Sequence, residues 1–173
     1  MRRIPVSALT AAAGRLLVAL LFGGALLTGT DSFGESSRAN SRCVQAGGTL
    51  MTNFISQTTT LGTATGDLKG AVAATILSVT PGPGSATTFR VQHQWVTEAG
   101  ETLAFEPADA VGVPAQAPGV FGVTYEEVEL VGGTGKYDGA RGQLRLFGAA
   151  DLQRGETVFR YEGEVCFRSA GGP

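Results

Sequence analysis

The sequence predicts an all-β protein: a single closed antiparallel β-barrel of about eight strands, preceded by a signal peptide. From Gly48 onwards, short runs rich in β-branched and aromatic residues alternate with turn clusters, and no stretch has a sustained helical period. The chain's 26 glycines follow no period of three, which indicates many turns rather than a collagen helix. Its two cysteines lie near the two ends of the folded region. A bond between them would place the first and last strands side by side.

The first 30 residues have the pattern of a signal peptide. Arg2 and Arg3 supply the positive charges, and an apolar run follows at Leu16–Leu27. This run is shorter than the roughly 20 residues of a membrane span, although an uncleaved anchor is the alternative. We expect cleavage between residues 28 and 39, secretion to the extracellular space, and a mature form with no stable membrane span.

The rest of the chain is expected to form one domain between two flexible ends. Residues 31–42 are polar and aperiodic and predict a flexible leader, residues 43–168 the barrel, and residues 169–173 a flexible tail. In an oxidising compartment two cysteines usually pair, so Cys43 and Cys166 are expected to form a disulfide. Two buried free thiols are the alternative.

The expected strands are separated by clear turn signals. Pro81–Gly84 ends the second strand because prolines cannot continue a ladder of hydrogen bonds. Residues 98–101 form a tight hairpin connection, whereas 107–119, with three prolines, is expected to be a long loop. Strands are expected at 49–60, 72–79, 87–97, 102–105, 120–131, 142–150 and 157–167.

Two strands show which residues face inward. In 87–97 one face carries Phe89, Val91, His93 and Trp95, and the other carries Arg90, Gln92 and Gln94. The last strand alternates in the same way, with Phe159, Tyr161, Val165 and Phe167 on one face. This period of two predicts strands with one packed and one solvated face.

Composition excludes several classes of function. Charged residues make up 16% of the chain and the formal net charge is −2, so no basic surface attracts nucleic acid. The sequence contains no nucleophile elbow, no phosphate-binding loop and no cluster of metal ligands. Hydrolases and kinases are therefore not predicted, and neither a metal nor a cofactor is expected.

One segment carries a family resemblance. Residues 130–142, Leu-Val-Gly-Gly-Thr-Gly-Lys-Tyr-Asp-Gly-Ala-Arg-Gly, resemble the GGTG-aromatic-x-GA-x-G signature of the allene oxide cyclase and dirigent barrels. The turn Thr65–Lys69 is similar to a second motif of this superfamily, and the resemblance covers 48–167. It implies an eight-stranded barrel with an apolar cavity. The motif's glycines are expected to build a bent connection between strands: Gly132, Gly133, Gly135, Gly139 and Gly142.

The resemblance also implies a function. Dirigent proteins are secreted, often have a disulfide between the ends of the barrel, and carry an Ala-Arg-Gly triplet like residues 140–142. Allene oxide cyclases use a carboxylate and an asparagine of the first strand, where this chain has Asn53 but no acidic residue. The chain thus looks like a secreted barrel that binds a small apolar molecule and steers its cyclisation or coupling.

Several side chains are candidates for the site. His93, the only histidine, shares a face with apolar residues and is a polar group for an apolar cavity. Only one of the adjacent Glu126 and Glu127 can point inward, where it could act as an acid or base; the alternative is that both are rim or surface charges. Candidate catalytic residues are His93, Glu126 and Arg141, and candidate ligand-binding residues are Phe89, Val91, His93, Trp95 and Tyr125.

The sequence leaves three functions open. The protein is an isomerase-like or cyclase-like enzyme that acts by cavity shape, a non-catalytic lipocalin-like carrier, or a structural barrel filled by its own side chains. Its expected partner is a small apolar molecule, and a homo-oligomer is left open.

Overall fold

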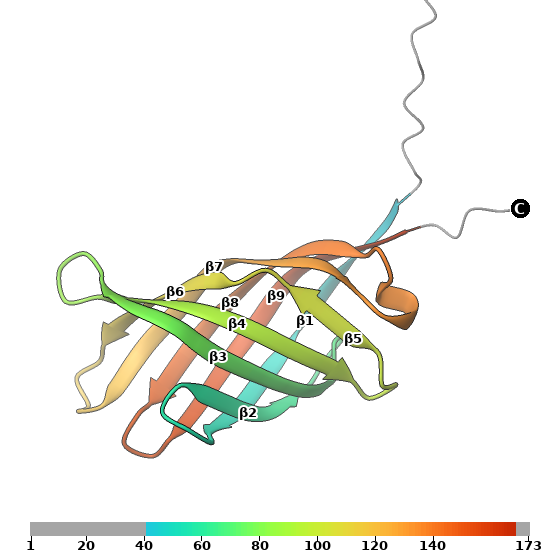
Figure 1. Ribbon diagram of the computed structural model, residues 1–173. Coiled ribbons are helices and arrows are strands. Elements are labelled where there is room, and N and C mark those ends of the chain that lie inside the picture. Colours follow the sequence, from blue (N-terminus) through green and yellow to red (C-terminus); the bar gives the residue numbers. More distant parts are fainter. Residues whose placement is uncertain (1–40, 169–173) are drawn as a thin grey trace, which may run out of the picture. The chain divides into compact units, whose positions relative to one another are not determined.

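A computed structural model describes residues 41–168 of the chain, which form nine strands and one short 3₁₀ helix (Figure 1). The elements are β1 (Ser41–Phe54), β2 (Thr59–Ala64), β3 (Gly70–Pro81), β4 (Thr87–Thr97), β5 (Thr102–Phe105), β6 (Ala108–Pro114), β7 (Val120–Gly133), η1 (Gly135–Tyr137), β8 (Arg141–Asp151) and β9 (Glu156–Arg168).

The sheet closes on itself as an antiparallel barrel. β9 pairs with β1 along nearly its whole length, from Ser41 opposite Arg168 to Asn53 opposite Glu156. The strands are hydrogen-bonded in the order β3, β2, β1, β9, β8, β7, β5, β4, and the pairing of β3 with β4 closes the circle. Each strand thus has a partner on both sides over part of its length, whereas β1 before Leu50 and β3 after Thr75 pair on one side only. The expected closed antiparallel barrel is confirmed.

The barrel has eight strand positions, because β5 and β6 share one. Both lie between β4 and β7: β5 pairs with β4 at residues 94–96, and β6 pairs with it at 87–91. Pro107 separates the two strands, since a proline has no N–H to donate to a ladder. The prediction of a long loop at 107–119 is wrong for residues 108–114, because these form β6. Pro107 and Pro114 lie at the ends of that strand, where proline is tolerated.

Other strand boundaries also differ from expectation. Residues 49–60 form parts of two strands, separated by a turn in which the Ser56 hydroxyl accepts hydrogen bonds from the N–H groups of Thr58 and Thr59. Ser41 and Arg42, expected in the leader, begin β1. The strands expected at 87–97 and 102–105 are confirmed. The predicted signal peptide and tail lie outside the described residues.

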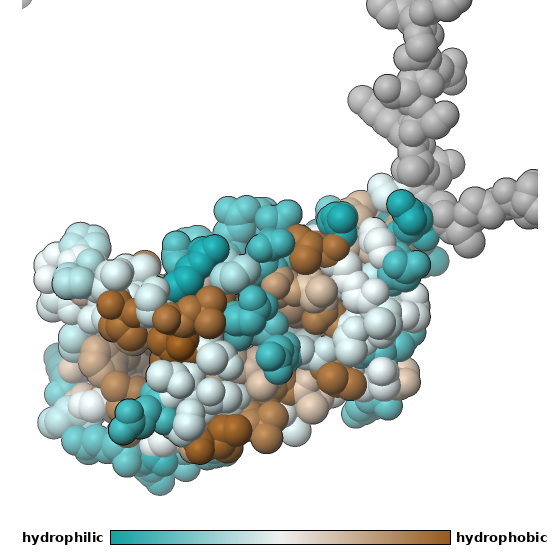
Figure 2. Space-filling view, in the orientation of Figure 1, coloured by the Kyte–Doolittle hydropathy of each residue, from teal (hydrophilic) through white to brown (hydrophobic). Residues whose placement is uncertain are grey.

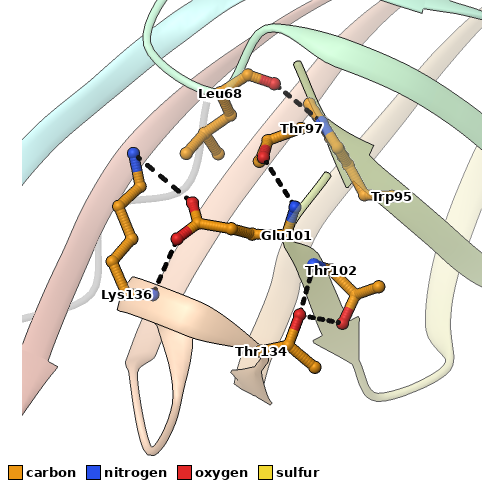
Figure 3. Close-up of polar contacts among 7 residues, drawn as sticks. All are labelled: Leu68, Trp95, Thr97, Glu101, Thr102, Thr134 and Lys136. Atoms are coloured by element: carbon orange, nitrogen blue, oxygen red, sulfur yellow. Dashed lines mark hydrogen bonds and ion pairs between the residues drawn. The ribbon is translucent and has the colours of Figure 1, made fainter. Parts of the chain in front are cut away.

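The aromatic side chains of Trp95 and Tyr161 fill one end of the barrel as a plug, and their polar atoms have hydrogen-bond partners. We call this the closed end and define it by these two residues and Leu68. The Trp95 indole N–H donates to the Leu68 carbonyl at 2.7 Å (Figure 3). The Tyr161 hydroxyl donates to the Thr65 carbonyl at 2.8 Å and accepts from the Leu68 N–H at 2.9 Å. The turn that contains Leu68 therefore caps this end of the core.

The glycine motif belongs to the same end. The Thr134 hydroxyl accepts a hydrogen bond from the Thr102 N–H at 2.8 Å, and the Glu101 carboxylate accepts one from the Lys136 N–H at 2.8 Å (Figure 3). Gly135 has a φ of +61°, a conformation that glycine adopts without strain, and a Cβ at Gly133 would collide with the Thr102 carbonyl. The motif thus fastens the β4–β5 hairpin to the connection between β7 and β8.

The predicted disulfide is present at this end too. Cys43 of β1 and Cys166 of β9 lie directly opposite each other across the seam that closes the barrel. The bond joins residues 123 positions apart in the sequence. It therefore holds together the first and last strands, as the positions of the cysteines predicted.

Candidate functional site

The opposite end of the barrel contains a cavity of about 80 Å³. We call it the open end and define it by Phe54, Phe121 and Leu152, which lie at the ends of β1, β7 and β8 farthest from the disulfide. The inward face of β4 contributes Phe89, Val91 and His93. No Asp, Glu, Lys or Arg lines the cavity, so a bound molecule would meet mostly hydrocarbon walls.

Hydrophobic side chains continue from the open end onto the outer surface. Figure 2 shows them gathered where β3 approaches its loop to β4. Leu77 and Val79 are more than half exposed there, and Ile55 in the turn after β1 is 64% exposed. The loop from 82 to 86 contains no charged residue. An apolar molecule therefore meets an apolar border at this end.

Polar side chains interrupt the apolar lining at four places, one of which is Thr60 on β2. The hydroxyls of Thr52 on β1 and Thr157 on β9 hydrogen-bond each other at 2.7 Å and satisfy each other. The remaining two are the side chains of His93 and Tyr125, whose ring centroids lie 5.2 Å apart with the rings at 66°. Unlike the hydroxyls of Thr52 and Thr157, Nδ1 of His93 has no hydrogen-bond partner among residues 41–168.

His93 is the least satisfied polar side chain of the cavity. It is 5% exposed, and no protein donor or acceptor in the described part of the chain lies within hydrogen-bonding distance of Nδ1. Burial away from water lowers the pKa of His93 to about 4, because the charged imidazolium loses its hydration. The imidazole is therefore neutral at pH 7.

Tyr125 faces the same cavity from β7. Burial raises the pKa of its phenol well above the usual range, so the hydroxyl keeps its proton and can donate a hydrogen bond. Its ring also packs edge-on against Phe159, with centroids 5.9 Å apart. The two neighbouring polar groups of the cavity, His93 and Tyr125, are thus both uncharged and held in place by aromatic packing.

Four of the five predicted ligand-binding residues line the cavity: Phe89, Val91, His93 and Tyr125. Trp95 does not, although it shares their face of β4. It lies two residues nearer the closed end, packs against Tyr161 and Phe105, and uses its N–H on Leu68. Trp95 is therefore part of the plug rather than of the site.

Of the two alternatives for the adjacent glutamates, the structure shows the one in which both are surface charges. β7 has a bulge between Tyr125 and Val128, so both residues between these two inward positions are on the outer surface. The Glu126 carboxylate is paired with Arg145 at 3.3 Å, and the Glu127 carboxylate accepts a hydrogen bond from Gln143. Both border a hollow on the outside of the barrel, not the cavity.

Two other candidates also lie outside the cavity. Arg141 is exposed, and its guanidinium donates to the carbonyl of the preceding Ala140 at 3.1 Å. Asn53, which stands where the resemblance places an asparagine, is exposed on the outer face of β1. Neither side chain can contact a molecule bound among Phe89, Val91 and His93 without rearrangement of the barrel.

Sequence reasoning missed two parts of the site. The Thr52–Thr157 pair joins strands at opposite ends of the sequence, and Phe121 closes the cavity from the start of β7. A signal for Thr157 was available, because it shares a strand face with Phe159 and Tyr161. A threonine on that face, however, is as compatible with a barrel core as with a cavity wall.

Within the described residues, no helix is long and apolar enough to cross a membrane. No protein-family model matches the sequence, and no curated protein matches it. Among solved structures, the pterocarpan synthase dirigent protein GePTS1 is similar at 15% identity and a TM-score of 0.34, over 77% of this chain and 89% of that one. The barrel architecture therefore rests on the strand pairing described above, and the function is argued from the cavity alone.

Proposed function

We propose that this protein is exported and binds one small, uncharged, apolar molecule in the cavity at the open end of its barrel. The observation that carries this proposal is His93: a buried imidazole that lines a cavity whose other lining is apolar except for three threonines and Tyr125. An unpaired buried polar group costs roughly 1–3 kcal/mol. A packed structural core would avoid that cost with an apolar residue at this position.

The size and chemistry of the cavity limit the ligand. Its volume of about 80 Å³ is below the several hundred Å³ that encloses a drug-sized molecule. A ligand therefore inserts one end into the cavity and leaves the remainder between Phe54, Ile76 and Phe121 at the border. Because the lining has no cationic group, a carboxylate or phosphate buried here would lack a counter-charge.

Any steering of a reaction would depend on cavity shape. The lining contains no carboxylate, and its one titratable base, His93, is a weak one with a pKa of about 4. The cavity is therefore suited to holding a reactive molecule in one conformation, away from water, while ring closure or coupling proceeds. A carrier without catalytic activity would use the same cavity. Analysis of the reaction product distinguishes the two functions, because a stereo-directing barrel changes the enantiomeric ratio of the product and a carrier does not.

Export accounts for the disulfide. A bond between Cys43 and Cys166 forms and persists in an oxidising compartment. The predicted signal sequence in residues 1–30 would deliver the chain there. Expression of the full chain in a secretion-competent host, followed by N-terminal sequencing of the product, tests this part: a new N-terminus between residues 28 and 39 supports export, and an intact N-terminus contradicts it.

Binding is tested by NMR titration of the isotopically labelled, oxidised protein with ethylbenzene, a neutral hydrocarbon of one aromatic ring. We expect saturable shifts of signals from Ile76, Val123 and other lining residues. Ile76→Trp fills the border of the cavity and should abolish them. Val158→Trp adds similar bulk on the outer face of β9, at a site 52% exposed and outside the lining, and should leave them unchanged.

A folded protein that shows no saturable shift contradicts the binding proposal. Equal loss of binding in Ile76→Trp and Val158→Trp also contradicts it, because the bulk at position 158 lies on the outer face of the barrel. The structural barrel filled by its own side chains would then be the better account.

A further inference from the structure

The polar atoms of the cavity also indicate which chemical group of the ligand they bind. This inference deepens the proposed function and rests on it. It starts from the two nitrogens of His93, which are not equivalent in their surroundings. Nδ1 is fully enclosed by protein and has no partner in residues 41–168. The ring nevertheless lines the cavity, so Nε2 is the nitrogen left for a group inside it.

The enclosure of Nδ1 favours one tautomer. A neutral imidazole carries a single proton, on Nδ1 or on Nε2. A proton on Nδ1 would enclose an N–H donor without an acceptor, and orphaned N–H donors are rarer in protein interiors than under-satisfied acceptors. The tautomer with the lower desolvation cost therefore carries its proton on Nε2 and leaves Nδ1 as an acceptor without a partner in residues 41–168. His93 then presents an N–H donor to the cavity.

Tyr125 offers a second donor next to the first. Its hydroxyl stays protonated, and its side chain lines the cavity beside His93. The His93 and Tyr125 rings are 5.2 Å apart and nearly perpendicular, and both line the same cavity. A ligand oxygen that lies within about 3 Å of both donors would accept two hydrogen bonds at once.

We propose that the His93 Nε2–H and the Tyr125 hydroxyl together bind one uncharged acceptor oxygen of the ligand, such as a carbonyl oxygen, deep in the apolar cavity. The ligand class is then an apolar ketone, aldehyde, quinone or ester rather than an alcohol or an acid. An alcohol would bring a further donor, for which the hydroxyl oxygens of the lining would have to serve as acceptors. Two neutral donors also polarise a carbonyl without placing a charge in a dry site.

The test compares three molecules of nearly equal shape: acetophenone has an acceptor oxygen, 1-phenylethanol a hydroxyl, and ethylbenzene no oxygen. We expect Tyr125→Phe and His93→Phe each to weaken acetophenone binding about fivefold to tenfold, the effect of one lost hydrogen bond. Ethylbenzene binding should change less than twofold. Tyr137→Phe, at the closed end and outside the cavity lining, serves as the control and should change neither.

Two measurements on the unmodified protein keep the test valid if a variant does not fold. Because His93 is the only histidine, its imidazole ¹⁵N signals are unambiguous and should show the proton on Nε2. The carbonyl stretch of bound, ¹³C-labelled acetophenone should lie at a lower frequency than in hydrocarbon solvent, as expected for two accepted hydrogen bonds.

The possible failures are distinguishable. If ethylbenzene binds but the Tyr125→Phe variant retains full affinity for acetophenone, the acceptor-oxygen inference is wrong and the binding function stands. Tighter binding of 1-phenylethanol than of acetophenone, or a proton found on Nδ1, also overturns the inference. If none of the three molecules binds to the folded protein, the proposed function itself fails.

Discussion

The two ends of this barrel differ in whether the polar atoms of their buried aromatic side chains have hydrogen-bond partners. At the closed end the Tyr161 hydroxyl makes two hydrogen bonds, to Thr65 and Leu68, and the Trp95 N–H makes one. At the open end, where Tyr125 and His93 line the cavity, Nδ1 of His93 has none within the described residues. Both pairs are buried aromatic groups with polar atoms. The difference is therefore one of arrangement rather than of composition.

This difference shows which end of the barrel has polar atoms available for a ligand. A satisfied polar group rigidifies a core, whereas an unsatisfied one lowers stability unless a ligand supplies the missing partner. Disulfide, glycine motif and aromatic plug are all at the closed end, which stabilises the barrel. The open end gives up some stability and keeps polar side chains, those of His93 and Tyr125, in contact with the cavity, a combination that is common at functional sites.

The largest expected effect is at the closed end. Replacing both Cys43 and Cys166 by alanine removes a crosslink that spans 123 residues of sequence, and we expect the free energy of unfolding to fall by about 2–5 kcal/mol. Urea denaturation of oxidised wild type and the double variant measures this loss. Ethylbenzene affinity of the folded variant should remain unchanged. A loss below about 1 kcal/mol, or a loss of binding without unfolding, would contradict the division between the two ends.

The pH dependence of stability should report on the open end. Burial lowers the pKa of His93 from 6.5 to about 4, so between these pH values the unfolded chain binds a proton that the folded protein does not. This contribution to stability is fully present above pH 6.5 and is lost as the pH falls towards 4. It amounts to about 3 kcal/mol at 1.36 kcal/mol per pKa unit.

The measurement for this prediction is the unfolding free energy of wild type and His93→Phe at several pH values. As the pH falls from 7 to 4, wild type should lose about 3 kcal/mol of unfolding free energy relative to His93→Phe. Carboxylates that titrate in both proteins cancel in this comparison. Parallel pH profiles for the two proteins would show that His93 is hydrated, contrary to its burial in the structure.

A matched pair of tyrosine variants compares the two ends directly. Tyr161→Phe leaves the Leu68 N–H and the Thr65 carbonyl without a partner, and we expect a loss of about 1–3 kcal/mol. Because the proposed role leaves the Tyr125 hydroxyl free for a ligand, Tyr125→Phe should change the free energy of unfolding by no more than about 0.5 kcal/mol. Thermal and urea unfolding of both variants check this contrast. Equal losses would mean that the Tyr125 hydroxyl has a partner in the folded protein.

The smallest expected effect concerns the threonine pair of the cavity. Either Thr52→Val or Thr157→Val leaves one buried hydroxyl unpaired and should cost about 1 kcal/mol. The double valine variant should cost less than the sum of the two, because no polar group is then left alone. A double-mutant cycle of unfolding free energies measures the coupling. Strict additivity would show that water or another group replaces the missing partner.

The sequence by itself determined which residues face inward. Strand alternation has a period of two, a local property, so the common face of Phe89, Val91, His93 and Trp95 could be predicted without knowing any neighbouring strand. Two cysteines near the ends of the domain predicted that the first and last strands meet, and the glycine motif predicted a bent connection.

Only the tertiary structure decided how deep each inward residue lies. Alternation assigns a side chain to a face but not to a height along the barrel, so it could not separate His93 in the cavity from Trp95 in the plug. Nor could it reveal the bulge that turns both Glu126 and Glu127 outward, because a bulge depends on the pairing of β7 with β8. Depth and register come from contacts between strands far apart in the chain, which no local pattern encodes.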